Sequence, residues 1–382
     1  MNRDRISIVF AGDFCSTKPS GITMSENLKS LLLSTDFNVV NFEGPLASDR
    51  FAAPNKTVLR QSDESPKWCE ENGFNIISLA NNHLLDFGID GMRRTVGAFR
   101  KSKVIGVGKW REAYKVHFFE NEGKRIGLFA ASSADLASLQ DVKRESSEGS
   151  AWINHPSVNG IIKEAKKECD YLLVFVHAGV EYMKVPLPEW RLRFKELVDI
   201  GADAVICSHP HVVQGWEEYN GCPIVYSLGN FFFDYFKQKG KPDGWDNGLI
   251  VKLELSNLKH AVSFECFPTI KYGQLIQLDN TKQTKEYVDS LCDIIRKEDE
   301  YEDIVNKEVQ SLYPKYKGWL LYGLGAIDNT EKSFKSRIKI MLKQLCPSNG
   351  NAMVALHQIR EESTRYILTR GLMLQNTETE IK

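Results

Sequence analysis

The sequence lacks any apolar run long enough to cross a membrane. The longest one, around 171–176, stops at His177, whereas a spanning helix needs about 20 residues. The stretch that opens the chain is also too short, and too soon followed by Gly12-Asp13, to be a secretory signal. We therefore expect a chain that starts at Met1 and has no transmembrane segment.

Closely spaced cysteines are absent as well. The 8 cysteines are scattered, and the nearest pair, Cys207 and Cys222, is far from a CxxC spacing. This distribution argues against a zinc ribbon and against a disulfide framework. A reducing compartment fits the pattern, so we expect a cytoplasmic protein.

An excess of charge of either sign is missing. The 49 lysines and arginines nearly balance the 50 aspartates and glutamates, which leaves a net charge of −1. A nucleic-acid binder would carry a basic surface, so we expect no nucleic-acid partner. With 42% hydrophobic residues, the composition is that of a folded chain. Its 382 residues allow two or three domains, or one large domain with an appendage.

Short apolar, β-branched runs recur along the first 270 residues and predict buried strands. These runs are 6–11, 39–42, 75–79, 104–107, 116–119, 126–130, 172–176, 204–207 and 224–226. Helical patterns lie between several of them, over 90–102, 157–168 and 188–200. The alternation predicts an α/β fold, and hairpin signals at 121–123 and within 248–268 make the expected sheet mixed.

The character of the sequence changes after residue 270. Charged helical segments follow, over 282–297, 302–312, 332–345 and 352–368. We therefore predict one domain over 1–270 and a helical C-terminal extension over 271–382. The segment 332–345 is basic and amphipathic, which is typical of a helix packed on a core and, less often, of one that lies on an anionic membrane. Peripheral contact with a membrane or with a protein machinery stays open.

Polar residues follow five of the predicted strands at the point where each strand ends. They are Asp13, Asn41 with Glu43, the run Asn81-Asn82-His83, His177, and the run His209-Pro210-His211. Ligands bind at the carboxyl ends of strands in open α/β sheets, so we expect these side chains to meet. Carboxylate, imidazole and amide oxygen together suit Mn²⁺, Fe or Zn²⁺. One or two ions are expected, with Glu43 as the natural bridge, and hydrolysis is the expected reaction.

Each motif also has a purely structural explanation when it is taken alone. Gly12-Asp13 by itself is more often a turn, and Asn81-Asn82-His83 is about as often a turn before a helix. Asp86 strengthens the second motif, because a carboxylate three residues after His83 can orient its imidazole. Pro210 strengthens the last one, because an extended backbone there can direct both neighbouring histidines to one site.

Six segments carry a family resemblance in the right order along residues 5–270. They are Gly12-Asp13, Asn41-Phe42-Glu43-Gly44-Pro45-Leu46, Ser78-Leu79-Ala80-Asn81-Asn82-His83 with Asp86-Phe87-Gly88, His177-Ala178-Gly179-Val180-Glu181-Tyr182, His209-Pro210-His211-Val212-Val213-Gln214-Gly215 and Tyr226-Ser227-Leu228-Gly229-Asn230-Phe231. Together they resemble the CapA family of poly-gamma-glutamate capsule biosynthesis, which is similar to the calcineurin-like metallophosphatases. The resemblance implies a four-layer α/β/β/α sandwich of two mixed sheets.

The resemblance also implies roles for individual residues. One ion would be held by Asp13, Glu43 and His211, and the other by Glu43, Asn82, His177 and His209. His83 would protonate the leaving group or stabilise the transition state, with Asp86 behind it. Three further residues would support the ligands or contact substrate, namely Asn41, Glu181 and Asn230.

The sequence departs from the metallophosphatase pattern at its first motif. Metallophosphatases carry Asp-x-His there, whereas this chain has Asp13-Phe14-Cys15. Cys15 could serve as an extra thiolate ligand, but without the histidine we expect the first metal site to be the weaker one. Lys56 and Arg60 lie in a polar loop, where a cation could meet a phosphate or a polymer carboxylate. A solvated loop explains each of these two residues more readily.

Two functions therefore stay open at this point. The first is a metal-dependent hydrolase that acts on a phosphoester, or on an anionic polymer or its precursor. The second is a non-catalytic component of a capsule or polyglutamate machinery, whose pocket binds an anionic chain. The intact Asn82-His83 and His209-Pro210-His211 motifs favour the first, and the missing histidine favours the second.

Overall fold

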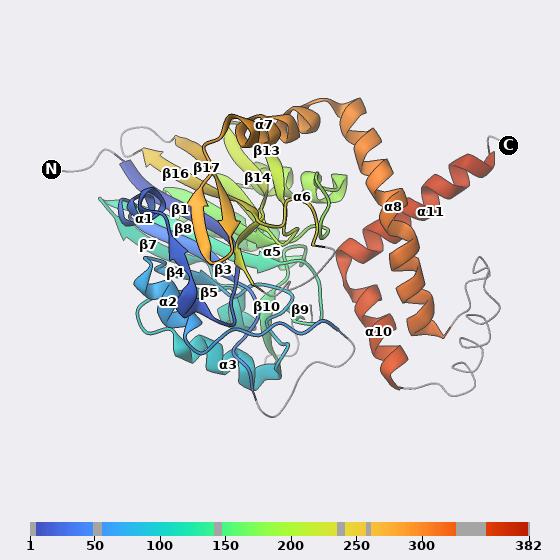
Figure 1. Cartoon of the computed structure of the whole chain (residues 1–382), viewed down its shortest axis with the longest axis horizontal. Coiled ribbons are helices and arrows are strands. Elements are labelled where there is room, and N and C mark those ends of the chain that lie inside the picture. The colour runs from blue at the N-terminus through green and yellow to red at the C-terminus, as the bar shows by residue number, and fades with distance from the viewer. Residues whose placement is uncertain are drawn as a thin grey trace.

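Two large β-sheets dominate the structure, a computed structural model that describes residues 5–48, 56–140, 147–234, 241–256, 261–325 and 349–380 (Figure 1). The nine-stranded sheet consists of β1 (Arg5–Cys15), β2 (Thr23–Met24), β3 (Phe37–Phe42), β4 (Ile76–Ser78), β5 (Lys103–Ile105), β15 (Asn230–Phe233), β16 (Asn247–Ser256), β17 (Val262–Tyr272) and β18 (Leu275–Leu278). The six-stranded sheet consists of β7 (His117–Asn121), β8 (Lys124–Ser132), β11 (Tyr171–His177), β12 (Ala204–Ser208), β13 (Val213–Tyr219) and β14 (Cys222–Leu228).

Both sheets are mixed, as predicted. The strand order of the first is β2-β18-β17-β16-β1-β3-β4-β5, with β15 beside β1, and that of the second is β13-β14-β12-β11-β8-β7. Strands β1, β3, β4 and β5 run parallel, as do β8, β11, β12 and β14. Antiparallel hairpins form the two edges of the smaller sheet, and in the β7–β8 hairpin Glu122 and Gly123 both have positive φ, as a tight two-residue turn requires.

Buried apolar side chains fall into three layers. In the middle layer the two sheets face each other, and the rings of Phe10 and Phe175 lie 5.4 Å apart. Burial of each such ring contributes about 1.5–3 kcal/mol. Helices α1 (Glu26–Leu33), α2 (Ser65–Glu71) and α3 (Gly88–Ala98) cover the outer face of the larger sheet. Helices α5 (Ser157–Lys167), α6 (Pro188–Asp199) and α8 (Glu298–Leu324) cover the smaller one. The predicted four-layer sandwich is confirmed.

The predicted strand over 104–107 is in fact two strands. It divides at Gly106 into β5 and β6 (Val107–Lys109), and β6 joins β10 (Glu148–Ala151) and β9 (Ser138–Leu139) in a separate three-stranded sheet, close to the short helix α4 (Trp110–Ala113). Gly106 has a φ of +76°, and a Cβ there would lie 2.7 Å from the Cβ of Ala80. Only glycine fits the turn that moves the chain between sheets.

The C-terminal helices also differ in their bounds from the prediction. Strand β18 belongs to the nine-stranded sheet, so this sheet continues past residue 270 to Leu278. Helix α7 (Lys282–Arg296) is as expected, α8 is longer, and the segment 352–368 is two helices, α10 (Asn349–Arg360) and α11 (Glu362–Glu380). The predicted helix over 332–345 lies outside the described residues.

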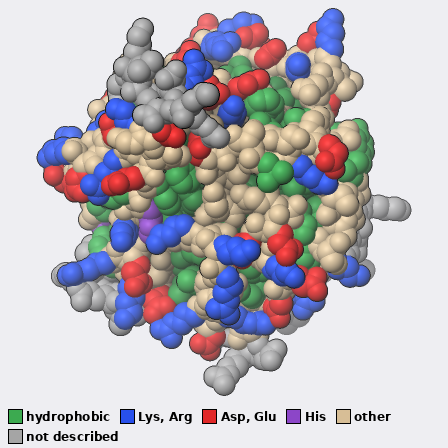
Figure 2. Space-filling view, turned by 90° about the vertical axis from the view of Figure 1, so that its left-hand side faces the viewer, with side chains coloured by type: hydrophobic (Ala, Val, Ile, Leu, Met, Phe, Trp, Pro, Cys, Tyr) green, Lys and Arg blue, Asp and Glu red, His purple; other side chains and the backbone are tan. Residues whose placement is uncertain are grey.

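Helices α8, α10 and α11 pack against one another at one end of the molecule (Figure 1). Among the described helices, none combines the length and the apolar character that a bilayer crossing requires. On the face at the opposite end, basic and acidic side chains are interspersed (Figure 2), in keeping with the nearly balanced charge of the chain.

Candidate metal centre

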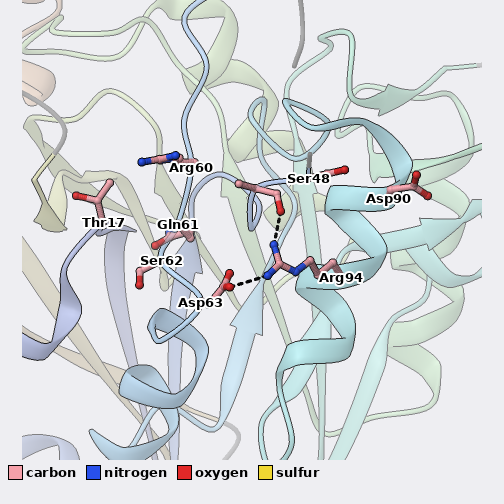
Figure 3. Close-up of a pocket in the computed structure, with 9 residues that line it drawn as sticks. Thr17, Ser48, Arg60, Gln61, Ser62, Asp63, Asp90 and Arg94 are labelled. Carbon is pink, nitrogen blue, oxygen red and sulfur yellow. Dashed lines mark hydrogen bonds and ion pairs between the residues drawn. The ribbon is translucent and has the colours of Figure 1, made fainter. Parts of the chain in front are cut away.

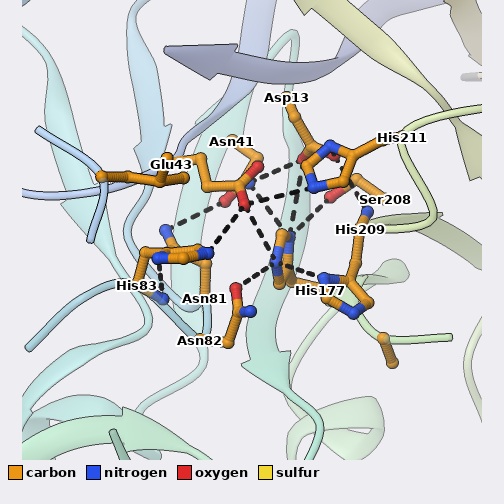
Figure 4. A network of polar contacts seen from close by, with 12 residues as sticks. Asp13, Asn41, Glu43, Asn81, Asn82, His83, His177, Ser208, His209 and His211 are labelled. Atoms are coloured by element: carbon orange, nitrogen blue, oxygen red, sulfur yellow. Dashed lines mark hydrogen bonds and ion pairs between the residues drawn. The ribbon is translucent and has the colours of Figure 1, made fainter. Parts of the chain in front are cut away.

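The carboxyl ends of strands from both sheets meet at one edge, where the predicted ligands gather (Figure 4). Asp13 lies in β1, Glu43 follows β3, and His211 follows β12. All three side chains are buried, and their ligand atoms lie within 4.8 Å of one another. We call these three residues the Asp13 group.

Glu43 lies at the centre of the arrangement. Its Oε1 lies 3.6 Å from Nε2 of His211, 3.8 Å from Nε2 of His83 and 4.0 Å from Nε2 of His177. Neither of its carboxylate oxygens has a hydrogen-bond partner. Burial raises the pKa of Glu43 well above its usual range, and the charge of Asp13 adds to the rise. A buried carboxyl group without donors needs a proton or a cation, so this site fits a metal ion.

A second set of ligands lies on the other side of Glu43. Nε2 of His177 lies 3.0 Å from Oδ1 of Asn82 and 3.1 Å from Nδ1 of His209. Burial lowers the pKa of His209 well below its usual value, and the charges of His177 and His211 lower it further. The neutral imidazole is the form that binds metals. We call Asn82, His177 and His209 the His177 group.

Asn41 and Asn230 form hydrogen bonds with the predicted ligands. Nδ2 of Asn41 donates to Oδ1 of Asp13 at 2.7 Å and lies 3.1 Å from Nδ1 of His177. Nδ2 of Asn230 donates to the Trp245 carbonyl, which identifies the other amide atom, Oδ1, as an acceptor. This Oδ1 lies 3.0 Å from Nδ1 of His211 and accepts the proton on that nitrogen. This hydrogen bond leaves Nε2 of His211 free to face Glu43, as a ligand nitrogen must.

His83 is held by a buried ion-pair network. Its Nδ1 lies 2.6 Å from Oδ2 of Asp86, which also accepts from the Leu59 amide. The other oxygen of Asp86 pairs with Nζ of Lys56 at 2.7 Å. Burial raises the pKa of Asp86, but His83 and Lys56 together outweigh burial and leave this pKa below its usual value. Asp86 therefore stays ionised and keeps a proton on Nδ1 of His83, with Nε2 toward Glu43.

The backbone of the His209-Pro210-His211 run is not extended at its histidines, which corrects the prediction. His209 and His211 have φ values of +106° and +59°, which are unusual outside glycine. The His209 amide donates to Oδ2 of Asp13 at 3.0 Å, and the Pro210 carbonyl accepts from the Tyr182 amide at 2.8 Å. Strained residues held by such contacts are typical of functional sites.

Gly12 has a steric role beside Asp13. A Cβ at Gly12 would lie 2.0 Å from the carbonyl oxygen of Gly229, to which the Asp13 amide donates at 3.1 Å. The register of β1 against β3 shifts between Ala11 and Asp13. This irregularity directs Asp13 into the site, as bulges next to active sites often do.

Cys15 and Arg60 are not among the clustered ligands of the described residues, although the charge of Glu43 reaches Cys15. Cys15 packs with Leu59 and Phe233, and burial raises the pKa of its thiol well above the usual value. The ligand cluster among the described residues does not include it. Arg60 lines a surface pocket of about 720 Å³ together with Arg94, whose guanidinium pairs with Asp63 (Figure 3). Their functional roles stay predictions.

The remaining predicted residue, Glu181, is partly exposed near the site, and its charge also raises the pKa of Glu43. Lys56 was expected in a solvated loop, which is wrong, because its side chain is 9% exposed and paired with Asp86.

Two supporting residues were given no individual role by the sequence analysis. Nε2 of Gln61 donates to the carbonyls of Phe14 and Glu43, at 2.7 and 2.9 Å. Nδ2 of Asn81 donates to the Phe42 carbonyl at 2.9 Å. Asn81 was expected at the site as part of the Asn81-Asn82-His83 run, whereas nothing in the sequence marks Gln61.

Comparisons with known proteins identify a family and related sequences. Residues 8–235 match the family described as "Bacterial capsule synthesis protein PGA_cap". The chain is 28% identical over 243 residues to the PGA biosynthesis protein CapA of Bacillus subtilis (strain 168), covering 60% of this chain and 64% of that protein. It is 33% identical over 214 residues to the capsule biosynthesis protein CapA of Bacillus anthracis, covering 53% and 52%. The chain thus spans between about half and two thirds of the length of these relatives.

Solved structures show weaker similarity. A hypothetical protein from Thermus thermophilus aligns with a TM-score of 0.43 at 14% identity, covering 69% of this chain and 99% of that one. The calcineurin-like phosphoesterase YfkN from Bacillus subtilis aligns with a TM-score of 0.41 at 13% identity, covering 78% and 98%.

Proposed function

The chain belongs to the PGA_cap family of bacterial capsule synthesis proteins, and from this premise we propose that it is a metal-dependent hydrolase with two ion sites that share Glu43. The substrate class we propose is a phosphoester, or an anionic polymer or its precursor, in capsule metabolism. The proposal depends above all on Glu43, whose two buried oxygens lack hydrogen bonds and face three histidines.

The residues present fit divalent ions by their chemistry. The Asp13 group would hold one ion, and Glu43 with the His177 group would hold the other. Carboxylate, imidazole and amide oxygen suit Mn²⁺, Fe or Zn²⁺. When bound, such ions supply a nucleophile from water at neutral pH and neutralise negative charge in the transition state.

His83 would donate a proton to the leaving group. Asp86 fixes Nδ1, so Nε2 is the atom that points into the site, 3.8 Å from Glu43. A second proton on Nε2 gives an imidazolium that the Asp86 carboxylate stabilises, and this proton can pass to the departing oxygen. Lys56 holds the other oxygen of Asp86 and so restrains the pair.

The pocket beside the site offers one arginine to an anionic substrate. Arg60 and Arg94 line it together with Asp63 and Asp90, and Arg94 is paired with Asp63, so Arg60 is the guanidinium that would bind a carboxylate or a phosphate. The chain segment of Arg60 also reaches the site itself, because the neighbouring Leu59 amide donates to Asp86. If part of the substrate binds in this pocket, the segment of Leu59 and Arg60 therefore lies between that part and His83.

A direct test measures turnover of a generic aryl phosphate and of an aryl phosphodiester by the Mn²⁺-loaded protein. Turnover should fall at least about a hundredfold in His83→Ala while Mn²⁺ content is retained, since general acids contribute on that scale. His117→Ala is the matched control, because His117 lies in the edge strand β7. Its activity should equal that of the unmodified chain.

The competing function predicts a different outcome. If the chain retains Mn²⁺ but hydrolyses neither ester, and His83→Ala changes nothing, a non-catalytic role in binding an anionic polymer replaces the hydrolase proposal. If the chain retains no Mn²⁺ or Zn²⁺ after loading, the metal proposal itself is overturned.

A further inference from the structure

The junction between α10 and α11 reaches the edge of the sheets where the ligands lie. Both oxygens of the Glu362 carboxylate are engaged there, since one accepts the Ala134 amide at 2.7 Å and the other accepts Nδ2 of Asn154 at 2.9 Å. The hydroxyl of the next residue, Ser363, donates to the carbonyl of Gly179. These contacts join residues more than 180 positions apart in the sequence. Figure 1 shows this end of α11 turned toward the sheets.

Two of the three contacted segments, those of Ala134 and Gly179, are tied to the proposed ligand His177. Gly179 lies two residues after His177. The amide of Ser133, next to Ala134, donates to the carbonyl of His177 at 3.0 Å. The junction therefore supports the His177 backbone from two directions. Ser363 holds the segment that follows His177, and Glu362 holds the loop whose Ser133 amide donates to His177.

The burial of the junction between α10 and α11 indicates a specific contact with the sandwich. Glu362 is 2% exposed and Ser363 is 1% exposed. Removing a carboxylate from water is unfavourable unless donors replace the water, and here two N–H donors do so. A helix that packed without specific contacts would leave such a carboxylate exposed to solvent.

Other side chains of the junction lie in the electrostatic neighbourhood of His83. Nδ1 of His357 lies 3.9 Å from Oδ1 of Asp135. Burial lowers the pKa of His357, and the charges of Lys56 and His83 lower it further. Burial, together with the charges of Asp135 and Glu181, raises the pKa of Glu361 to about 7. The helical extension thus lies beside the site.

We infer that Glu362 is a positioning residue for His177, so that the C-terminal helices complete the second of the two ion sites. The inference rests on the proposed metal binding, but it concerns residues that lie outside the matched family region of 8–235. Without the carboxylate, the loop after β8 loses its contact with α11, and the support that this loop gives to the His177 backbone through the Ser133 amide is weakened.

The test is a titration of the full chain with Mn²⁺ against a fluorescent chelator, which reports the number and the affinity of sites. In Glu362→Ala, the affinity of one site should fall about 10- to 100-fold, as it does when groups that orient metal ligands are removed, while the other site is unchanged. Glu362→Gln keeps one acceptor oxygen and should recover part of the loss.

The matched control is Arg370→Ala, on the same helix. Nε of Arg370 pairs with Glu189 of α6 at 2.9 Å, which is a contact between the extension and the sandwich without a ligand loop. This variant should lose some thermal stability and keep both affinities. A purely structural role for Glu362 would make the two variants alike.

The outcomes separate the two proposals. If the unmodified chain binds no Mn²⁺, the proposed function fails. If it binds two ions and Glu362→Ala binds both with unchanged affinity, only the present inference is overturned. Should Glu362→Ala fail to fold, Glu362→Gln and Ser363→Ala decide, because the inference requires at least one of them to weaken a single site.

Discussion

The Asp13 group and the His177 group differ in how their ligand atoms are engaged. In the Asp13 group, Asn230 contacts Nδ1 of His211, which does not face the ion, and each oxygen of Asp13 accepts one hydrogen bond, which leaves it a lone pair for an ion. The oxygens of Glu43 have no hydrogen bonds at all. This group is therefore ready for an ion without rearrangement.

In the His177 group, the ligand atoms contact one another. Nε2 of His177 lies 3.0 Å from Asn82 and 3.1 Å from His209, so an ion must replace these contacts. The geometry therefore predicts tighter binding at the Asp13 group. The missing histidine at the first motif predicts the opposite order, and titration of variants decides between the two.

The largest effect is expected from Glu43→Gln, which removes the residue common to both groups. Bound Mn²⁺ should fall from two ions to none, measured by elemental analysis after gel filtration. With metal removed from both proteins, the variant should also be more stable than the unmodified chain at pH 8, by about 1–3 kcal/mol in urea unfolding, because a buried carboxyl without donors is removed. Burial raises the pKa of Glu43, so this advantage should disappear as the pH falls and the carboxyl is protonated.

Glu181→Gln is the control for this prediction. Glu181 lies near Glu43 but outside both groups, so the variant should keep two ions. Loss of metal in Glu181→Gln as well would mean that overall charge, and not ligation by Glu43, retains the ions.

The second prediction compares the two groups directly. His209→Ala should bind one Mn²⁺ with the affinity of the tighter site, whereas His211→Ala should lose that tighter site. Calorimetric titration measures both. If His209→Ala instead removes the tighter site, the order of affinities follows the missing histidine and not the geometry.

The third prediction uses a buried carboxyl outside both groups. Glu308 of α8 accepts the Lys184 amide at 3.1 Å, and burial raises its pKa to about 7. A raised pKa means that the protonated form stabilises the fold, so this contribution is lost as the pH rises from about 5 to 8. Relative to Glu308→Gln, the unmodified chain should lose roughly 1–2 kcal/mol over this range, since the side chain keeps some contact with water. Parallel pH profiles in urea unfolding would contradict this account.

The smallest effect is expected from Cys15→Ser. Burial and the charge of Glu43 keep the thiol protonated, and Cys15 packs with Leu59 and Phe233 without being part of the ligand cluster. Mn²⁺ affinity should change less than about threefold. A drop of tenfold or more at one site would make Cys15 the ligand that replaces the missing histidine.

The core of the site was readable in the sequence because each ligand lies at or just after the carboxyl end of a strand. Asp13, Glu43 and His211 come from segments far apart in the chain, but β1, β3 and β12 bring them to the edge where strands of the two sheets meet. The apolar runs predicted the buried strands of an α/β fold, whereas the four-layer sandwich was expected from the family resemblance alone.

The supporting contacts could not be read in this way. Gln61 acts through carbonyl groups, and Glu362 reaches Ala134 across 228 positions, so neither leaves a pattern of spacing. The split at Gly106 was missed because a strand that changes sheets keeps its apolar character. These supporting contacts and the change of sheet are determined by tertiary contacts, which the periodicity of the sequence does not predict.

The most direct test of the shared role of Glu43 is anomalous scattering from crystals of the Mn²⁺-loaded chain. We predict two anomalous peaks that flank Glu43, one beside Asp13 and His211 and the other beside His177 and His209. Peaks away from Glu43, or a single peak that Glu43 does not contact, would contradict the account.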